Sequence, residues 1–250
     1  MAEEGKSTVR AVERALDILQ CFTAGTDFGM TEIADRVGLH KSTVHRMLST
    51  LEDRGFVERD PATERYRLGF RVWELSAHLT SSDDPAVIWL PEMERLRNVL
   101  GETVSLYVRD GGERIRIQAV QSNQAVRRVA TVGARLPLYV GASSKVLIAF
   151  ADEATQAEIW GELESIQPTV VNKHMFECQM NEIRHHGYAT SMEEREPGAA
   201  AVSAPIFDRH GRLVAALSIS GPSSRLTLDR MKEIAPTVIE AAARMGTMAR

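Results

Sequence analysis

Residues 31–48 read TEIADRVGLHKSTVHRML, and this stretch decides the fold of the N-terminal part of the chain. Its first half repeats apolar residues at helical spacing up to Val37, where Gly38 stops the helix because glycine tolerates left-handed backbone. Its second half starts another helix, with Val44 and Leu48 on one face. Two helices joined by such a short turn bury their apolar faces only by crossing steeply, which is the geometry of a helix-turn-helix.

The flanking segments complete a winged helix-turn-helix. Residues 9–22 carry apolar side chains three and four positions apart and predict an amphipathic first helix. The last of the three helices is expected to start at residue 40 or 41 and to end at residue 54. Residues 56–59 and 65–68 read as two short strands around the turn at 60–63, and this hairpin would be the wing.

The outer face of the third helix and both wing strands carry side chains suited to DNA. Arginine can bind guanine through two hydrogen bonds, whereas lysine and hydroxyl groups bind phosphates. The candidate DNA-binding residues are Lys41, Ser42, Thr43, His45, Arg46, Arg59, Arg65 and Arg67. A three-helix bundle used for protein contacts is the alternative, and the arginines of the wing favour DNA over it.

Charge by itself does not indicate a nucleic-acid binder. The chain has a net charge of −4, and residues 1–82 hold eleven Lys and Arg against thirteen Asp and Glu. Residues 36–51, however, contain Arg36, Lys41 and Arg46 and no acidic residue. A phosphate responds to charges within about a Debye length, so this local excess matters more than the total.

Four segments resemble the isocitrate lyase regulator (IclR) family of bacterial transcription regulators. They are residues 9–19, VRAVERALDIL; 31–34, TEIA; 38–48, GLHKSTVHRML; and 66–69, YRLG. Many family members have proline where this chain has His40, and histidine also permits a helix start. The resemblance spans the whole chain and implies a C-terminal domain of GAF-like fold that binds a small-molecule effector.

A connecting helix is expected over residues 70–79. Phe70 and Trp73 are too apolar for a bare connector, so they either pack on their own winged domain or dimerise two chains. The resemblance implies dimerisation. The expected organisation is an N-terminal tail at 1–8, a winged helix-turn-helix at 9–69, a linker and dimerisation helix at 70–83, and an effector-binding domain at 84–250.

The C-terminal part alternates between strands in hairpins and helices. Residues 114–120 are expected to return from the hairpin turn at 110–112 with isoleucines inward and arginines outward. Asp84 and Pro85 are suited to start a helix, which Pro91 should kink or restart. Further strands are expected at 103–108, 187–192, 201–207 and 213–220, with a closing helix at 227–248. This predicts an α+β protein whose second domain is an antiparallel sheet with packed helices.

The resemblance places the effector pocket on small and polar residues of this domain. They are Gly141, Ala142, Ser191, Ala201, Ser218 and Ser220. Family members frequently have aspartate at position 191 and cysteine at 201, so the pocket should be roomier and less acidic here. An organic acid is the expected effector, and a larger one, such as an aromatic acid, is an open hypothesis. The alternative is that these small residues serve tight sheet packing.

Other activities find less support in the sequence. The chain contains neither a Gly-x-Ser-x-Gly nucleophile motif nor a phosphate-binding Gly-x-x-x-x-Gly-Lys-[Ser/Thr] loop, so no enzyme and no cofactor are expected. His174 and Cys178 share a helical face and, with His185 and His186, could hold a structural zinc, although an ordinary amphipathic helix fits equally well. A ligand-binding or scaffolding protein without DNA activity remains the second alternative.

The sequence also gives expectations for the location of the protein and for its partners. No stretch approaches the roughly 18 apolar residues of a membrane span, and the start MAEEGK lacks a signal-peptide core. Two cysteines, Cys21 and Cys178, suit a reducing cytoplasm. The expected partners are a double-stranded operator, an effector and further copies of the chain in a homodimer or homotetramer, with an imperfect palindrome as operator. Repression and activation both remain open.

Overall fold

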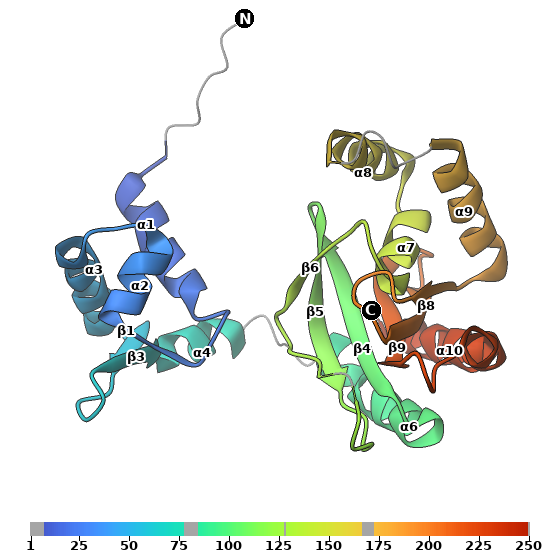
Figure 1. Cartoon of the computed structure of the whole chain (residues 1–250), viewed down its shortest axis with the longest axis horizontal. Helices are drawn as coiled ribbons and strands as arrows, with labels where there is room; N and C mark the ends of the chain where they lie inside the picture. The colour runs from blue at the N-terminus through green and yellow to red at the C-terminus, as the bar shows by residue number, and fades with distance from the viewer. Residues whose placement is uncertain (1–7, 78–84, 128, 167–172, 250) are drawn as a thin grey trace, which may run out of the picture. The chain divides into compact units, whose positions relative to one another are not determined.

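The structure is a computed structural model that describes residues 8–77, 85–127, 129–166 and 173–249. The chain divides into two compact units, Met1–Ser81 and Ser82–Arg250 (Figure 1). The expected end of the linker helix at 78–83 and the cap Asp84 lie outside the described residues.

The first unit is a winged helix-turn-helix followed by one helix. In chain order its elements are α1 (Arg10–Cys21), β1 (Asp27–Gly29), α2 (Met30–Val37), α3 (Lys41–Asp53), β2 (Val57–Arg59), β3 (Arg65–Leu68) and α4 (Phe70–Ala77). The strands form an antiparallel sheet in the order β1-β3-β2. Strand β1 was not expected from sequence, since its three residues are too few to show an alternating pattern.

The turn between α2 and α3 forms as the sequence predicts. Gly38 adopts a left-handed conformation with φ 63° and ψ 33°, and the N–H of Leu39 donates to the carbonyl of Ala34 at 3.1 Å. His40 caps α3, because its side chain accepts a hydrogen bond from the Ser42 N–H at 3.3 Å. Histidine at position 40 therefore does start the helix.

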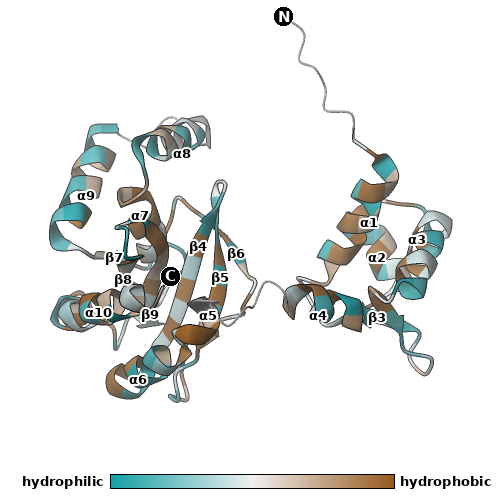
Figure 2. Ribbon diagram, turned by 180° about the vertical axis from the view of Figure 1, so that it is seen from behind, coloured by the Kyte–Doolittle hydropathy of each residue, from teal (hydrophilic) through white to brown (hydrophobic). Residues whose placement is uncertain are grey.

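Two helices of this unit leave apolar side chains exposed. On α4, Phe70 is 75% and Trp73 is 68% exposed, so the interpretation that they pack on their own winged domain is wrong for the single chain. Val12 and Leu16 of α1 are also exposed, although they belong to its apolar stripe. Both helices carry hydrophobic stretches in Figure 2.

The second unit is a six-stranded antiparallel sheet with helices on both faces. Its helices are α5 (Pro85–Ile88), α6 (Leu90–Leu100), α7 (Ala142–Ala149), α8 (Glu153–Ile166), α9 (Lys173–His186) and α10 (Leu228–Met248). Its strands are β4 (Thr103–Asp110), β5 (Glu113–Val120), β6 (Arg135–Pro137), β7 (Ala189–Met192), β8 (Ala199–Phe207) and β9 (Leu213–Pro222). The strand order is β6-β5-β4-β9-β8-β7. The predicted α+β class is confirmed, and the short edge strand β6 was missed.

Helices α6 and α10 cover one face of this sheet, and α7 to α9 lie on the other (Figure 1). The first face forms the larger core, in which Leu106, Leu217 and Ile219 of the sheet meet Leu96 of α6 and Val238 of α10. Pro91 lies in the first turn of α6, which begins after α5 ends at Ile88. The prediction that this proline restarts the helix is therefore confirmed.

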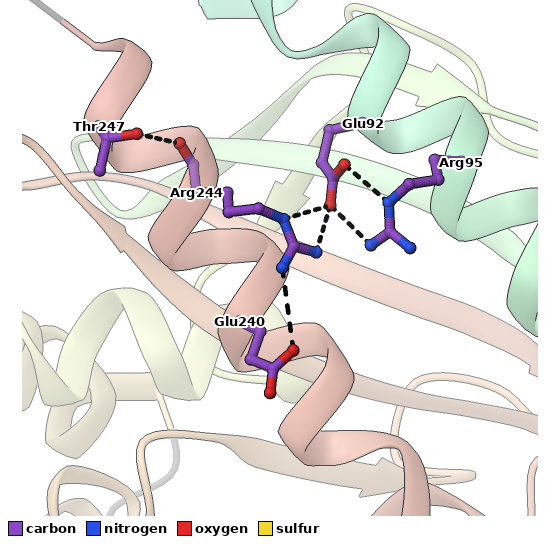
Figure 3. A network of polar contacts seen from close by, with 5 residues as sticks. All are labelled: Glu92, Arg95, Glu240, Arg244 and Thr247. Carbon is purple, nitrogen blue, oxygen red and sulfur yellow. Dashed lines mark hydrogen bonds and ion pairs between the residues drawn. The ribbon is translucent and has the colours of Figure 1, made fainter.

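A carboxylate shared by two arginines joins α6 to α10. Glu92 accepts hydrogen bonds from Arg95 at 2.8 Å and from Arg244 at 2.7 Å, and Arg244 also lies 3.8 Å from Glu240 (Figure 3). These donors hold the pKa of Glu92 below its ordinary value of 4.5, with Arg95 the main cause. The two helices on this face are thus tied by paired charges as well as by apolar packing.

One sequence prediction about strand β5 is wrong. The arginines were expected to face outward, but Arg114 is 3% and Arg116 is 7% exposed, while Ile115 is only partly buried. The alternation itself is correct. Because helices lie on both faces of the sheet, the face carrying the arginines is enclosed as well, and they point toward the side of α7 rather than toward water.

Candidate functional site

The exposed face of α3 is the first candidate site. Val44 and Leu48 are fully buried and fix the helix against α1 and α2, so its opposite face points outward. Lys41, His45 and Arg46 are exposed there. Ser42 is exposed too, with its hydroxyl 2.8 Å from His40 Nδ1, and Thr43 is partly buried.

The wing differs from α3 in the state of its cations. Among the described residues no carboxylate pairs with Lys41 or Arg46, whereas each wing arginine has an acidic partner. Arg59 pairs with Glu64, and Arg67 pairs with Glu58 at 3.0 Å. The sequence placed these arginines on the wing, but it could not show that they were paired.

Arg65 has a structural role within the unit. It donates to Asp27 of β1 and, at 2.9 Å, to Glu32 of α2, so it ties the wing strand to the helix-turn-helix. The hydrogen bond with Asp27 raises the pKa of Arg65. Of the three wing arginines it is therefore the least available to a phosphate.

The second candidate site is a cavity in the second unit, between the sheet and the start of α7. Its volume is about 50 Å³. All six residues singled out from the sequence line it: Gly141, Ala142, Ser191, Ala201, Ser218 and Ser220. The structure thus brings together residues from α7 and its preceding loop, β7, β8 and β9. Their binding role stays a prediction.

Gly141 at the entrance to α7 can only be glycine. Its backbone has φ 96° and ψ 158°, a region essentially closed to side chains with a Cβ. A Cβ there would also lie 3.2 Å from Arg114 Nη2. The Gly141 N–H donates to Glu194 at 3.2 Å, and Glu194 also pairs with Lys145. A carboxylate of the chain itself therefore accepts from the residue that precedes α7.

Sequence reasoning missed the arginines of this cavity. Arg114 and Arg116 line it from β5, Arg195 lines it from the loop after β7, and Tyr107 lines it from β4. Arg114 Nη1 donates to the carbonyls of Pro137 and Val140, each at 2.6 Å, and to the Ser144 hydroxyl. The signal was present, since Arg114 and Arg116 alternate with isoleucines.

Arg116 is held by Tyr107 on the neighbouring strand. The two residues are paired in the β4–β5 register, so they share a face of the sheet. Arg116 donates to the Tyr107 hydroxyl through Nη2 at 2.6 Å and Nε at 3.0 Å, and to the Thr131 carbonyl at 3.1 Å. All of these acceptors are formally neutral oxygens.

The electrostatics of the cavity are therefore those of an anion site. Burial lowers the pKa of Arg114 well below its ordinary value, to about 10, so its guanidinium still carries a positive charge at neutral pH. None of the residues lining the cavity is acidic. Arg114, Arg116 and Tyr107 also line the cavity, and the prediction that it is roomier and less acidic than in other family members stays a prediction.

A row of serines forms the sheet surface next to the cavity. Ser105, Ser218 and Ser203 lie side by side on β4, β9 and β8 in one register. Among the described residues the buried hydroxyls of Ser105 and Ser203 have no hydrogen-bond partner. This polar sheet face differs from the opposite one, which is apolar throughout its centre.

The candidate zinc ligands on α9 do not converge. His174 Nε2 and Cys178 Sγ are 3.7 Å apart, but His185 lies eleven residues along the same helix from His174, or about 16 Å at 1.5 Å per residue. The described part of the chain holds no group of three or more such residues able to share one ion.

A winged helix-turn-helix followed by a domain whose cavity is lined by arginines and serines is the architecture of a ligand-responsive transcription regulator. Family models match the chain over residues 11–61, described as the IclR helix-turn-helix domain, and 78–247, described as the bacterial transcriptional regulator IclR C-terminal. The chain belongs to the IclR family. The resemblance noted in the sequence is thus confirmed, and the protein is a regulator rather than an enzyme.

Individual relatives agree over nearly the full chain. The HTH-type transcriptional regulator XynR of Escherichia coli (strain K12) is 34% identical over 87% of this chain and 88% of its own. An IclR regulator structure from Alicyclobacillus acidocaldarius is 28% identical, with TM-score 0.81, covering 97% of this chain and all of the other. An IclR homologue from Microbacterium hydrocarbonoxydans, crystallised with 4-hydroxybenzoate, is 26% identical, with TM-score 0.82 over 96% and 99% of the chains. In the described residues no helix is long and apolar enough to cross a membrane.

Proposed function

We propose that this regulator reads operator DNA with α3 and the wing, and that an organic acid bound in the cavity of the second unit controls its affinity for that operator. One observation supports both parts of the proposal. Cations without acidic partners lie on the exposed face of α3 and around the cavity.

On α3, Arg46 and His45 are proposed to reach base edges in the major groove, and Lys41, Ser42 and Thr43 to bind phosphates. Residues at a helix start also offer free backbone N–H groups to a phosphate. Arg59 and Arg67 of the wing would exchange their acidic partners for the DNA backbone, and Arg65 would contribute least. Exposed ion pairs are weak, so such an exchange costs little.

Dimerisation supplies the second recognition helix. Phe70 and Trp73 expose large apolar surfaces on α4, and these are best explained by a partner copy. A two-fold dimer presents two equal α3 helices, so the operator is proposed to be an imperfect palindrome. Both homodimers and homotetramers satisfy this requirement.

The functional boundaries are proposed as a tail at 1–8, the winged domain at 9–69, the linker helix at 70–83 and the effector domain at 84–250. The protein is proposed to work in the cytoplasm, where its DNA is found.

An acid is the best-matched effector because the cavity offers guanidinium and hydroxyl donors and no carboxylate. The relative crystallised with 4-hydroxybenzoate holds an aromatic acid. A cavity of about 50 Å³ in this chain favours a smaller one. The effector then acts by linkage: it favours one state of the chain and so shifts operator affinity by its differential affinity for the two states.

The test uses the full chain and a fluorescent duplex selected by that chain from a random library. Binding should weaken steeply as salt increases, because phosphate contacts release counterions. Organic acids should then shift the Kd of the complex, whereas their neutral esters should not. Binding that is independent of salt would contradict the DNA-reading role, and equal effects of acids and esters would contradict the acid effector.

A further inference from the structure

The number of positive charges around the cavity defines the ligand more narrowly than "an acid". We propose that the site is built for a small dianion, such as a short dicarboxylate, with Arg114 and Arg116 as the residues that select for the second negative charge. This inference rests on the proposed function of the cavity and specifies its ligand class.

Arg114 is the first of the two selecting charges. Its side chain is 97% buried, and the backbone carbonyls and hydroxyl around Nη1 supply dipoles but no countercharge. Its Nε has no hydrogen-bond partner among the described residues. A buried cation without a counter-ion is costly, and a buried donor without an acceptor adds to that penalty. A ligand oxyanion paired with the Arg114 guanidinium would supply the missing countercharge.

Arg116 is the second charge and lies close to the first. The guanidinium carbons of Arg114 and Arg116 are 5.4 Å and 5.1 Å from the centre of the same Tyr107 ring. Burial is the main cause that lowers the pKa of Arg114, and the positive charges of Arg195 and then of Arg116 lower it further, so the like charges repel each other. One monoanion would neutralise only half of this pair, whereas a dianion neutralises both charges.

The third arginine of the lining does not belong to this pair. Arg195 lies 3.4 Å from Glu196, so it already has an acidic neighbour. Before α7, the Gly141 N–H donates to Glu194, so this one backbone donor already has a charged acceptor. We therefore assign the anionic groups of the ligand to the guanidinium groups of β5.

The volume of the cavity indicates the size of ligand that fits it without rearrangement. About 50 Å³ is room for roughly three to five water molecules at about 10–15 Å³ each. This suits a diacid of three or four carbons, and the lining also includes Ser218 and Ser220 as hydroxyl donors. An aromatic acid would require the cavity to widen.

The experiment compares ligands of nearly equal size that differ in one charge. Malonate and succinate are titrated into the full chain by calorimetry, beside their monoamides malonamate and succinamate and the monoacid butyrate. A diacid should bind at least about tenfold more tightly than its monoamide, since it forms one more charge-assisted hydrogen-bond set. Equal binding of a diacid and its monoamide would overturn the dianion inference.

Two substitutions test whether the arginines cause the preference for a diacid over its monoamide. Arg116→Gln and Arg114→Gln should each bring the diacid-to-monoamide ratio close to one, while Arg109→Gln on the exposed end of β4 should leave it unchanged. Gln keeps hydrogen-bonding capacity, and thermal unfolding checks that each variant is folded. An unchanged ratio in both folded pocket variants would also overturn the inference.

The two proposals fail in different ways. If monoacids bind as well as diacids and need Arg114, the chain is still an acid-responsive regulator and only the dianion inference is wrong. If none of these acids binds while operator DNA does, the acid effector and the dianion inference are both contradicted.

Discussion

The arginines on the two sides of the six-stranded sheet differ in whether they have an acidic partner. On one face Arg95 and Arg244 share Glu92, and this group joins α6 to α10 (Figure 3). On the other face Arg114 and Arg116 are more deeply buried and have only neutral acceptors. A buried charge is tolerated when it is paired. The first arrangement is complete within the chain, and the proposed ligand would complete the second.

The winged unit shows the same contrast at its surface. The arginines of the wing are paired with Glu58, Glu64, Asp27 and Glu32, whereas Lys41 and Arg46 on α3 have no such partner among the described residues. Exposed charges cost little when unpaired, so α3 can keep its cations free for DNA. In both units the unpaired cations mark the candidate sites, and the paired ones stabilise the scaffold.

The largest effect is expected from removing the free cations of α3. Lys41→Ala together with Arg46→Ala should lower operator affinity by about 100-fold and reduce the slope of log K against log salt by about one for each lost phosphate contact. The measurement is fluorescence anisotropy over a range of salt concentrations. Arg10→Ala with Arg71→Ala removes the same charge outside α3 and should change affinity little. Equal losses of operator affinity in both double variants would contradict a special role for the cations of α3.

The next largest effect is expected on stability, from a substitution of Gly141 at the cavity. Gly141→Ala should destabilise the second unit by about 1–3 kcal/mol, because φ 96° with ψ 158° is closed to alanine. At about 2–4 °C per kcal/mol, the melting temperature should fall by several degrees. Gly211→Ala is the control, since Gly211 has φ 75° and nothing within 4 Å of its added Cβ. A smaller loss at Gly141 than at Gly211 would show that the cavity entrance is not strained.

Glu92→Gln tests how much the group of Glu92, Arg95 and Arg244 contributes to stability. At pH 7 the variant should lose about 1–2 kcal/mol, because two arginines lose a charged acceptor. The pKa of Glu92 is lowered in the folded state, so its contribution is complete above 4.5 and disappears as the pH falls through the folded value. The gap between wild type and variant in urea unfolding should therefore narrow below pH 4.5. Glu240→Gln, whose side chain is 72% exposed, should show a much smaller gap.

The smallest effects are expected on the wing. Arg67→Ala should weaken operator binding by about threefold, because its pair with Glu58 already offsets its charge. Arg65→Ala should act mainly on folding, lowering the melting temperature of the first unit while the salt slope stays close to that of wild type. If Arg65→Ala instead reduced the slope as much as the α3 double variant, paired arginines would read DNA as well as free ones.

Short-range sequence patterns predicted much of the fold of the first unit. The helix-turn-helix, its glycine turn and the wing follow from short-range periodicity, which residues 31–48 show clearly. The six pocket residues were placed by resemblance, and all of them line one cavity. Strands β1 and β6 were missed because three residues cannot establish an alternation.

The sequence by itself determined the alternation of Arg114 and Arg116 with isoleucine, the cationic face of α3 and the family of the chain. Only the tertiary structure decided which of these charges are buried and which are paired. Pairing depends on residues far apart in the chain, as between Glu92 and Arg244, and burial of a strand face depends on whether a helix covers it. Neither is a property of local sequence, so the sequence alone does not show that Arg114 and Arg116 line a cavity on the side of α7.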